Sequence, residues 1–279
     1  MTLENTIKQA SELLKNHNIA SYELDAEIIL SDIMGVAREF LIVNDHTNVS
    51  KNIIRKYSFA IKRRINREPV AYITGKKEFW SENFTVNNTT LVPRPETEIL
   101  IYKVINYYKN KTINILDIGT GSGCILLSIL KELNFSRGIG IDISAKAIEI
   151  AKINSKNLNL LNKTKFEVCD LNKFSKGKYD LIVSNPPYIK LSDIGVLDRD
   201  IKFFEPNLAL NGGLDGYSKI RKVINKSSVL IKKDGKLILE IGFNQVIKTT
   251  KILKTNGFYV NRIVKDFSRI NRCIVSTKL

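Results

Sequence analysis

The sequence predicts an α/β fold in which a doubly wound, mostly parallel seven-stranded sheet follows a small N-terminal helical bundle. From residue 112 onward, short apolar runs rich in β-branched residues alternate with stretches of helical periodicity. A glycine-rich loop follows the first of these runs, and two consecutive prolines follow the fourth. Ligands of open α/β sheets bind at strand ends of this kind, so both loops are candidates for a functional site.

The strands and helices of the α/β domain can be placed individually. The seven strand candidates are residues 113–118, 138–143, 165–168, 179–184, 235–241, 258–264 and 271–277. The helices expected between them span residues 123–133, 145–158, 216–231 and 245–256. Because no helix separates the last two strands, we expect them to form a terminal antiparallel pair.

Residues 1–75 are expected to form the helical bundle, because apolar residues recur there at helical spacing. Ser21 and Ser50 are placed to cap two of the longer helices. The helix that Ser50 opens must end near Glu68, because Pro69 follows. We interpret this domain as a substrate-docking module, and a structural cap on the next domain is the alternative interpretation.

A linker of residues 76–95 joins the bundle to the α/β domain, which we expect to span residues 96–279. The aromatic and apolar residues of the linker predict a short β-hairpin that turns at residues 87–88. Pro95 suits the first position of the helix that follows. Arg94 therefore lies in a rigid turn between two prolines, where it either reaches the mouth of a site or serves the turn alone.

The composition indicates a globular protein, since 43% of the 279 residues are hydrophobic and 26% are charged. No apolar run has the length of a membrane span, and the N-terminus lacks the order of a signal peptide. The three cysteines, Cys124, Cys169 and Cys273, have no metal-like spacing. We therefore expect a cytoplasmic protein with reduced thiols, no metal site and no membrane partner, and a monomer by default.

The net charge of +16 admits two interpretations. It reflects either an acidic or nucleic-acid partner, or a composition that is rich in lysine throughout the chain. The only tight basic cluster is formed by residues 62–64. The charge alone therefore does not identify a substrate.

The tetrapeptide Asn185-Pro186-Pro187-Tyr188 ends a strand that is expected to be buried on both faces. Two prolines fix φ and remove two backbone donors, so neither sheet nor helix continues there. The carbonyls of Ser184, Asn185 and Pro186 then lack ladder partners and can face a ligand. Together with the Asn185 amide oxygen and the flat Tyr188 ring, they suit a planar NH2 group. An ordinary proline-rich turn is the alternative interpretation.

Residues 117–123 close the first strand of the α/β domain and open the next helix. Their three glycines allow a tight turn and a close approach of the backbone to a ligand. Asp142 ends the second strand, where a carboxylate can accept both hydroxyls of a ribose, and Asp170 follows the third. Asp117 would repel a pyrophosphate but attracts the positively charged methionine part of S-adenosylmethionine. The loop therefore favours this cofactor over a dinucleotide.

These features together resemble the class I S-adenosylmethionine-dependent methyltransferases. More narrowly, they resemble the glutamine N5-methyltransferases that modify peptide chain release factors, and the resemblance extends over almost the whole chain. Its motifs are Glu68-Pro69, Ala71 to Gly75, Glu78-Phe79-Trp80, Pro93 to Glu98, Asp117 to Gly123, Ser184 to Tyr188, Glu205-Pro206 with Ala209-Leu210, and Leu239 to Gly242 with Gln245.

The sequence departs from the family pattern at three positions. Leu171 replaces a frequent aromatic residue, Cys124 replaces a common alanine, and Asn271 replaces a frequent aspartate. These departures concern the detail of the adenine pocket and not the reaction class.

The resemblance implies transfer of a methyl group from S-adenosylmethionine to the side-chain amide nitrogen of a glutamine in a release factor, with no stable nucleic-acid partner. The implied catalytic residues are Asn185, Pro186, Pro187 and Tyr188. The implied cofactor-binding residues are Asp117, Gly119, Thr120, Gly121, Ser122, Gly123, Asp142, Asp170, Leu171 and Asn185.

Three other functions stay open on the residues alone. The first is methylation of a glutamine in a ribosomal protein, the reaction of a related enzyme. The second is methylation of RNA or DNA bases, because base methyltransferases carry similar tetrapeptides. The helices of residues 1–75 lack the aromatic-and-basic pattern of a nucleic-acid platform, which argues against the second of these. A catalytically silent cofactor-binding protein is the third, and the intact tetrapeptide and glycine loop argue against it.

Overall fold

The computed structural model describes residues 1–279, and the chain divides into two compact units. The first unit comprises residues 1–76 together with residues 198–204, and the second comprises residues 77–197 and 205–279. The predicted bounds placed residues 198–204 in the α/β domain instead. No helix has both the length and the apolar character that crossing a membrane requires.

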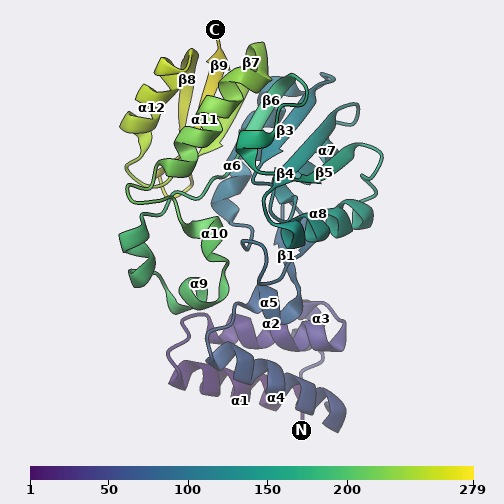
Figure 1. The fold of residues 1–279 in the computed structure, drawn as a ribbon. Coiled ribbons are helices and arrows are strands. Elements are labelled where there is room, and N and C mark those ends of the chain that lie inside the picture. Colours follow the sequence, from purple (N-terminus) through teal and green to yellow (C-terminus); the bar gives the residue numbers. More distant parts are fainter. The chain divides into compact units, whose positions relative to one another are not determined.

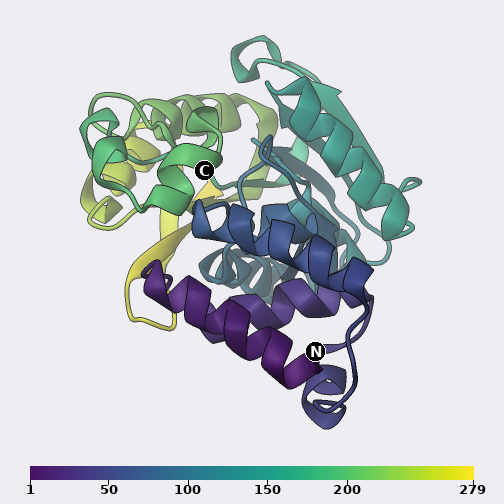
Figure 2. The same cartoon turned by 90° about the horizontal axis from the view of Figure 1, so that it is seen from below.

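The first unit is helical, as predicted, and its helices α1, α2 and α4 pack on one another (Figures 1 and 2). Its core is formed by apolar residues that recur at helical spacing, among them Leu14, Ile29 and Ile61. Its helices are α1 (Leu3–Asn16), α2 (Tyr22–Met34), α3 (Arg38–Val43), α4 (Lys51–Ile65), α5 (Val70–Thr74) and α9 (Arg199–Phe204).

Two details of the helix ends differ from the predictions. Ser50 caps α4 as expected, since its hydroxyl accepts the backbone N–H of Ile53 at 3.4 Å. Ser21 precedes α2 but makes no cap, because its hydroxyl donates to the Asp25 carboxylate at 2.8 Å instead. Helix α4 also ends earlier than predicted, at Ile65, because Arg67 has a left-handed φ of +73° that ends a right-handed helix.

The second unit contains the predicted seven-stranded sheet, and its doubly wound fold is confirmed (Figure 1). The strand order is β5-β4-β3-β6-β7-β9-β8, with β9 antiparallel to both of its neighbours. The strands are β3 (Asn114–Ile118), β4 (Arg137–Asp142), β5 (Thr164–Val168), β6 (Tyr179–Ser184), β7 (Ile231–Glu240), β8 (Phe258–Lys265) and β9 (Asn271–Lys278). Strand β7 begins earlier than predicted because Ile231 pairs with Tyr179 ahead of an irregularity in the register.

Helices cover both faces of this sheet because alternate strand residues point to opposite sides. Ile115 and Val183 belong to the core under α6, α7 and α8, whereas Leu116 and Ile182 belong to the core under α11 and α12. The helices of this unit are α6 (Glu98–Tyr108), α7 (Cys124–Glu132), α8 (Ala145–Asn157), α10 (Asn207–Leu210), α11 (Ser218–Leu230) and α12 (Val246–Thr255). Three short 3₁₀ helices, η1 (Pro95–Thr97), η2 (Leu171–Lys173) and η3 (Leu191–Val196), complete it.

The predicted β-hairpin exists, but its turn is not at residues 87–88. Strands β1 (Lys76–Phe79) and β2 (Glu82–Thr85) are joined by Trp80 and Ser81, whose φ angles are +51° and +57°. Contacts outside the hairpin hold this unusual turn, because the Trp80 backbone N–H donates to Glu98 at 2.9 Å. The side chain of Asn87 instead accepts the N–H of Thr89 in a separate turn.

Residues 198–204 join the first unit through a buried arginine. Arg64, on α4, has only 8% of its side chain exposed and donates to Asp25 on α2 at 2.6 Å. It also donates to Asp200 on α9 at 2.6 Å, across 136 positions of sequence. Removing one partner from such a buried group leaves charge without compensation.

We expect Arg64→Ala to lower the free energy of unfolding of the helical unit by about 3–5 kcal/mol, because two carboxylates then lose their shared cation. Urea denaturation followed by circular dichroism measures this change. Arg63→Ala is the matched control, since Arg63 is more exposed and pairs with Glu68 at the surface, where an ion pair contributes less than about 1 kcal/mol. Equal losses in the two variants would contradict the role given to Arg64.

Candidate active site

A cavity of about 270 Å³ lies in the second unit, at the carboxyl ends of β3, β4 and β6. Strand β3 pairs with β4 on one side and with β6 on the other, so the strand order reverses here. Ligands of doubly wound sheets bind in the crevice at such a reversal. Most residues predicted to bind cofactor or substrate line it: Gly119, Thr120, Gly121, Ser122, Asp142, Asp170, Leu171, Asn185, Pro186 and Pro187.

The glycine loop is hydrogen-bonded to the end of β4. The backbone N–H of Gly121 donates to the Asp142 carboxylate at 3.0 Å, and the N–H groups of Gly119 and Thr120 donate to the Ile141 carbonyl. Gly119 and Gly121 have φ angles of +74° and +55°, which disfavour any residue with a side chain. The loop thus presents bare backbone to the cavity.

Gly123 has a structural function and does not line the cavity. Its φ of +80° begins α7, and a Cβ there would lie 3.1 Å from Leu127 and 3.2 Å from Ala151. Glycine is therefore required for the close packing of α7 on α8. The glycine pattern in the sequence does not distinguish this function from contact with a ligand.

Asp142 has the position of a ribose acceptor, at the end of β4. Its two carboxylate oxygens accept the N–H groups of Gly121 at 3.0 Å and Ser144 at 2.9 Å. Burial raises its pKa, and these backbone donors oppose the rise. Each oxygen keeps a second lone pair, which suits it to accept a hydroxyl from the cavity.

Asp117 lies beneath the loop, fully buried, and does not line the cavity. One oxygen, Oδ2, accepts the Thr120 hydroxyl at 2.6 Å, whereas Oδ1 is buried without any partner. Burial, together with the nearby Asp142, raises the pKa of Asp117 to about 7. A buried carboxylate beneath the loop favours a cation in the cavity above it, such as the ammonium group of S-adenosylmethionine.

The predicted adenine-side residues also line the cavity. Asp170 opens η2, where its side chain accepts the N–H of Asn172 at 2.8 Å. Leu171 follows it and provides an apolar surface in place of an aromatic ring. Cys169 and Cys124 also line the cavity, although neither was predicted to.

The tetrapeptide has the geometry expected of an acceptor site. Strand β6 ends at Ser184, which lies in register with Ile118 and Leu239 of the neighbouring strands. The carbonyls of Asn185 and Pro186 accept no hydrogen bond from the protein. The Asn185 Nδ2 donates to the Thr97 hydroxyl at 3.3 Å, which leaves its Oδ1 available to a ligand.

Tyr188 is placed differently from the expectation that it packs on the substrate. Its ring lies against Gly242, and its hydroxyl donates to Glu240 at 3.3 Å, so it does not line the cavity. Burial raises the pKa of Glu240 to about 7, and the hydrogen bond from Tyr188 opposes the rise. Tyr188 therefore lies behind the site and supports it through these contacts.

Other residues of the lining were not predicted as ligand-binding. Thr97 follows the proline-flanked turn in which Arg94 was one candidate for the mouth of a site. Arg94 lines the cavity as well and pairs with the buried Glu205. Lys219 and Lys222 reach the cavity from α11. Only the tertiary structure brings this helix to the site, and its sequence carries no motif that marks it.

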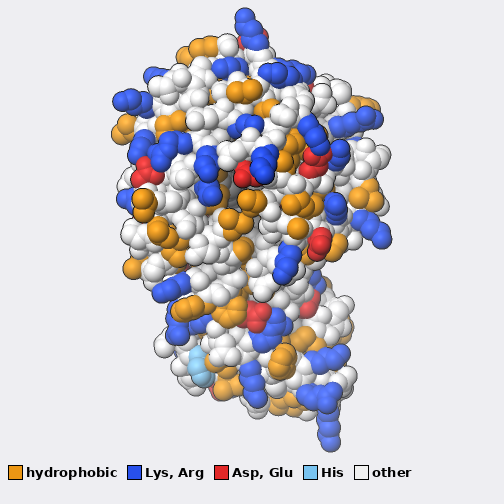
Figure 3. Space-filling view, in the orientation of Figure 1, with side chains coloured by type: hydrophobic (Ala, Val, Ile, Leu, Met, Phe, Trp, Pro, Cys, Tyr) orange, Lys and Arg blue, Asp and Glu red, His pale blue; other side chains and the backbone are white.

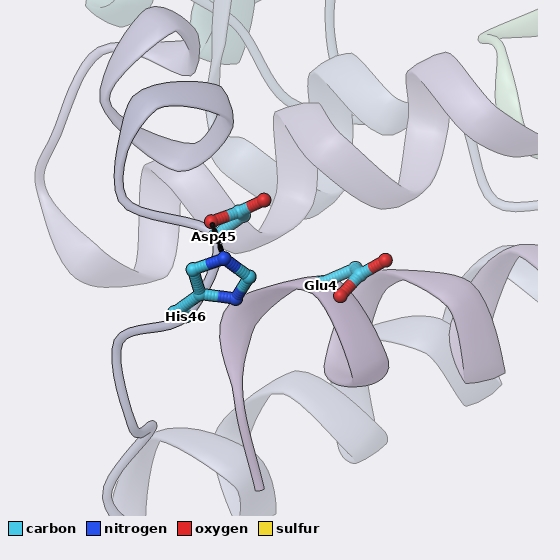
Figure 4. A group of neighbouring side chains, drawn as sticks. All are labelled: Glu4, Asp45 and His46. Carbon is cyan, nitrogen blue, oxygen red and sulfur yellow. Dashed lines mark ion pairs between the residues drawn. The ribbon is translucent and has the colours of Figure 1, made fainter.

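Two further features lie outside this site. A hollow of about 400 Å³ at the amino ends of the strands, near Arg137, is on the side of the sheet where ligands do not usually bind. In the first unit, Glu4, Asp45 and His46 bring their ligand atoms within 4.8 Å of one another (Figure 4). His46 is 89% exposed and pairs with Asp45 at 3.5 Å, so we assign this group no metal.

Known proteins are similar to both parts of the chain. Residues 5–75 match the family model described as PrmC N-terminal domain, and residues 109–270 match the one described as methyltransferase domain. A solved methyltransferase from Pyrococcus furiosus has a TM-score of 0.53 and 17% sequence identity. It covers 70% of this chain and 88% of its own, and this likeness supports the fold alone.

Two curated relatives align over nearly their full length. A release factor glutamine methyltransferase of Clostridium acetobutylicum is 36% identical, over 100% of this chain and 99% of that protein. Another, of Buchnera aphidicola subsp. Schizaphis graminum, is 38% identical over 100% of both chains. The chain therefore belongs to the release factor glutamine methyltransferase family and is an S-adenosylmethionine-dependent enzyme.

Proposed function

We propose that this enzyme methylates the side-chain amide nitrogen, N5, of a glutamine in peptide chain release factors, the proteins of translation termination. The observation that carries the proposal is the pair of unused acceptors in the cavity, the Asn185 Oδ1 and the Pro186 carbonyl. A primary amide has two N–H hydrogens, and two acceptors at the end of one strand suit both. The names of the relatives support the choice of release factors.

The chemical difficulty of this reaction is the weak nucleophilicity of an amide nitrogen, whose lone pair is delocalised into the carbonyl. When bound, S-adenosylmethionine supplies an electrophilic methyl group on a positively charged sulfur. Asn185 and Pro186 hold the substrate nitrogen by its two hydrogens and fix its orientation. As positive charge develops on that nitrogen, both hydrogen bonds strengthen, so these residues favour the transition state over the ground state.

The alternatives differ in the substrate rather than in the chemistry. Basic side chains on the visible face are spread among other residues and form no single patch (Figure 3). This distribution supports a composition effect as the source of the +16 charge, and we propose no stable nucleic-acid partner and a monomeric enzyme. We further propose that residues 1–75 dock the release factor and that the enzyme acts in the cytoplasm.

A labelling experiment tests the proposed substrate. The purified chain and methyl-labelled S-adenosylmethionine are offered release factors, ribosomal proteins and total RNA in parallel, and mass spectrometry locates the label. We expect the label on a glutamine of a release factor. Label on a ribosomal protein or on RNA, with release factors unmodified, would show that the substrate is assigned wrongly.

Asn185→Ala should lower turnover by about 10²–10³, the scale observed for loss of one positioned polar contact to a transition state. Cofactor affinity should stay nearly unchanged, because the glycine loop and Asp142 are untouched. Steady-state kinetics and titration calorimetry measure the two quantities. Asn162→Ala, at an exposed surface position, is the control, and an Asn185 variant as active as this control would refute the assignment.

Asp117 gives a prediction about pH. Its pKa of about 7 should fall when the cofactor ammonium lies in the cavity above the glycine loop, because an opposite charge favours the ionised carboxylate. Binding of S-adenosylmethionine then releases a proton, and its affinity should rise several-fold from about pH 6 to about pH 7.5. Calorimetry at both pH values should find Asp117→Asn weaker and almost independent of pH. A variant with the same pH dependence as the natural chain would exclude Asp117 as the cause.

A further inference from the structure

The chain that leaves the tetrapeptide packs closely against three glycines. A Cβ at Gly212 would lie 2.8 Å from the carbonyl carbon of Tyr188, and a Cβ at Gly216 would lie 2.7 Å from its carbonyl oxygen. A Cβ at Gly242 would lie 2.9 Å from Cδ2 of the Tyr188 ring. These separations are too short for packed atoms, so none of the three positions accepts a side chain without movement. Tyr188 is therefore enclosed by two loops, one that precedes α11 and one that precedes α12.

A buried glutamine joins these two loops to Tyr188. Gln245 directly precedes α12 and is 7% exposed. Its Nε2 donates to the carbonyl of Tyr188 at 3.2 Å and to the carbonyl of Gly216 at 3.1 Å. Its Oε1 accepts the backbone N–H of Gly242 at 3.0 Å. One side chain thus fixes the backbone after β6, the backbone before α11 and the backbone after β7.

The partners of Gln245 determine which way its amide points. The carbonyls of Tyr188 and Gly216 only accept hydrogen bonds, so the NH2 group must face them. The backbone N–H of Gly242 only donates, so the amide oxygen must face it. An ionised glutamate has the same shape but no proton to donate, and it would turn an oxygen toward two carbonyl oxygens. The junction therefore requires a neutral amide rather than a carboxylate.

The tetrapeptide is held chiefly at its two ends. At the first end, Ser184 pairs within the sheet, and its hydroxyl donates to the last carbonyl of β3 at 2.7 Å. At the other end, Gln245 holds the carbonyl of Tyr188. Between the two ends, the carbonyls of Asn185 and Pro186 accept no hydrogen bond from the protein, and the two prolines have a fixed φ. The positions of these two acceptors therefore depend on how firmly each end is held.

We propose that Gln245 is a positioning residue for methyl transfer, which fixes the far end of the tetrapeptide and thereby places the acceptors of Asn185 and Pro186. This inference rests on the proposed function of those two residues. Gln245 does not line the cavity and touches neither substrate nor cofactor. It acts through the Tyr188 carbonyl, because movement of that end shifts the acceptors away from the two hydrogens of the substrate amide.

Two variants of Gln245 remove different parts of the junction. Gln245→Met keeps the length of the side chain and removes all three hydrogen bonds. Gln245→Glu keeps the acceptor for Gly242 and removes both donors. Ser136→Ala is the matched control for lost buried hydrogen bonds. Ser136 is 1% exposed, accepts the N–H of Ile113 at 3.1 Å, and donates to a carbonyl at the other edge of the sheet from the cavity.

We expect both Gln245 variants to lower kcat by about 10- to 10²-fold, since a displacement of about 1 Å costs up to about 10²-fold in rate. Titration calorimetry counts the chains that bind S-adenosylmethionine, and kcat is expressed per binding chain, so unfolded protein does not contribute. The affinity for S-adenosylmethionine and the KM for the release factor should change little, because the glycine loop and residues 1–75 are untouched. Ser136→Ala should lower the midpoint of urea unfolding and keep the natural kcat.

A double-mutant cycle with Asn185→Ala separates positioning from a structural function. If Gln245 acts by placing the acceptors, Gln245→Met should cost clearly less in the Asn185→Ala background than in the natural background. The remaining cost there reports the displaced carbonyl of Pro186.

The outcomes that contradict the proposal are distinct from those that contradict the proposed function. Natural kcat in both Gln245 variants, equal losses in the two backgrounds, or an equal loss of kcat in Ser136→Ala would overturn the positioning by Gln245. Each of these leaves the function of Asn185 intact. Natural turnover in Asn185→Ala itself would overturn the proposed function, and the positioning with it.

Discussion

The pairing of β3 with β6 is the constraint on which the functional part of this structure depends. These two strands meet where the strand order reverses, so the loops that follow them diverge to opposite sides of one crevice. The Ser184 hydroxyl donates to the Ile118 carbonyl at 2.7 Å and joins the two strand ends. One loop carries the glycines and the other carries the tetrapeptide. A cofactor and a planar amide can therefore meet between loops that lie 66 positions apart in sequence.

The site contains more buried negative charge than a stable core alone would require. Asp117 and Glu240 are buried, and one carboxyl oxygen of each accepts no hydrogen bond. Burial raises the pKa of both groups to about 7. Such groups make the folded state less stable, because a buried carboxylate loses solvation that the protein only partly replaces. In this enzyme Asp117 suits a cationic ligand, whereas Glu240 accepts the Tyr188 hydroxyl behind the cavity.

In the helical unit, by contrast, the carboxylates of Asp25 and Asp200 are compensated by one buried cation, Arg64. Arg64 donates to Asp25 and to Asp200, and the second of these bonds draws residues 198–204 into the unit. The same segment of chain begins shortly after the tetrapeptide and ends just before Glu205, the partner of Arg94 at the cavity. This segment and the residue that follows it thus each form an ion pair with an arginine.

The sequence by itself determined the doubly wound fold, the helical N-terminal part, the cofactor class and the residues at the two loops. These features follow from local physics: apolar periodicity selects strands and helices, and glycine and proline end them at fixed positions. Only the tertiary structure decided which of those residues face the cavity, since Asp117, Gly123 and Tyr188 lie behind it. It also decided the hairpin turn at Trp80, the attachment of Asp200 to Arg64, and the contact of Thr97 with Asn185. Each of these depends on hydrogen bonds between residues that are distant in sequence, and no local pattern encodes such partners.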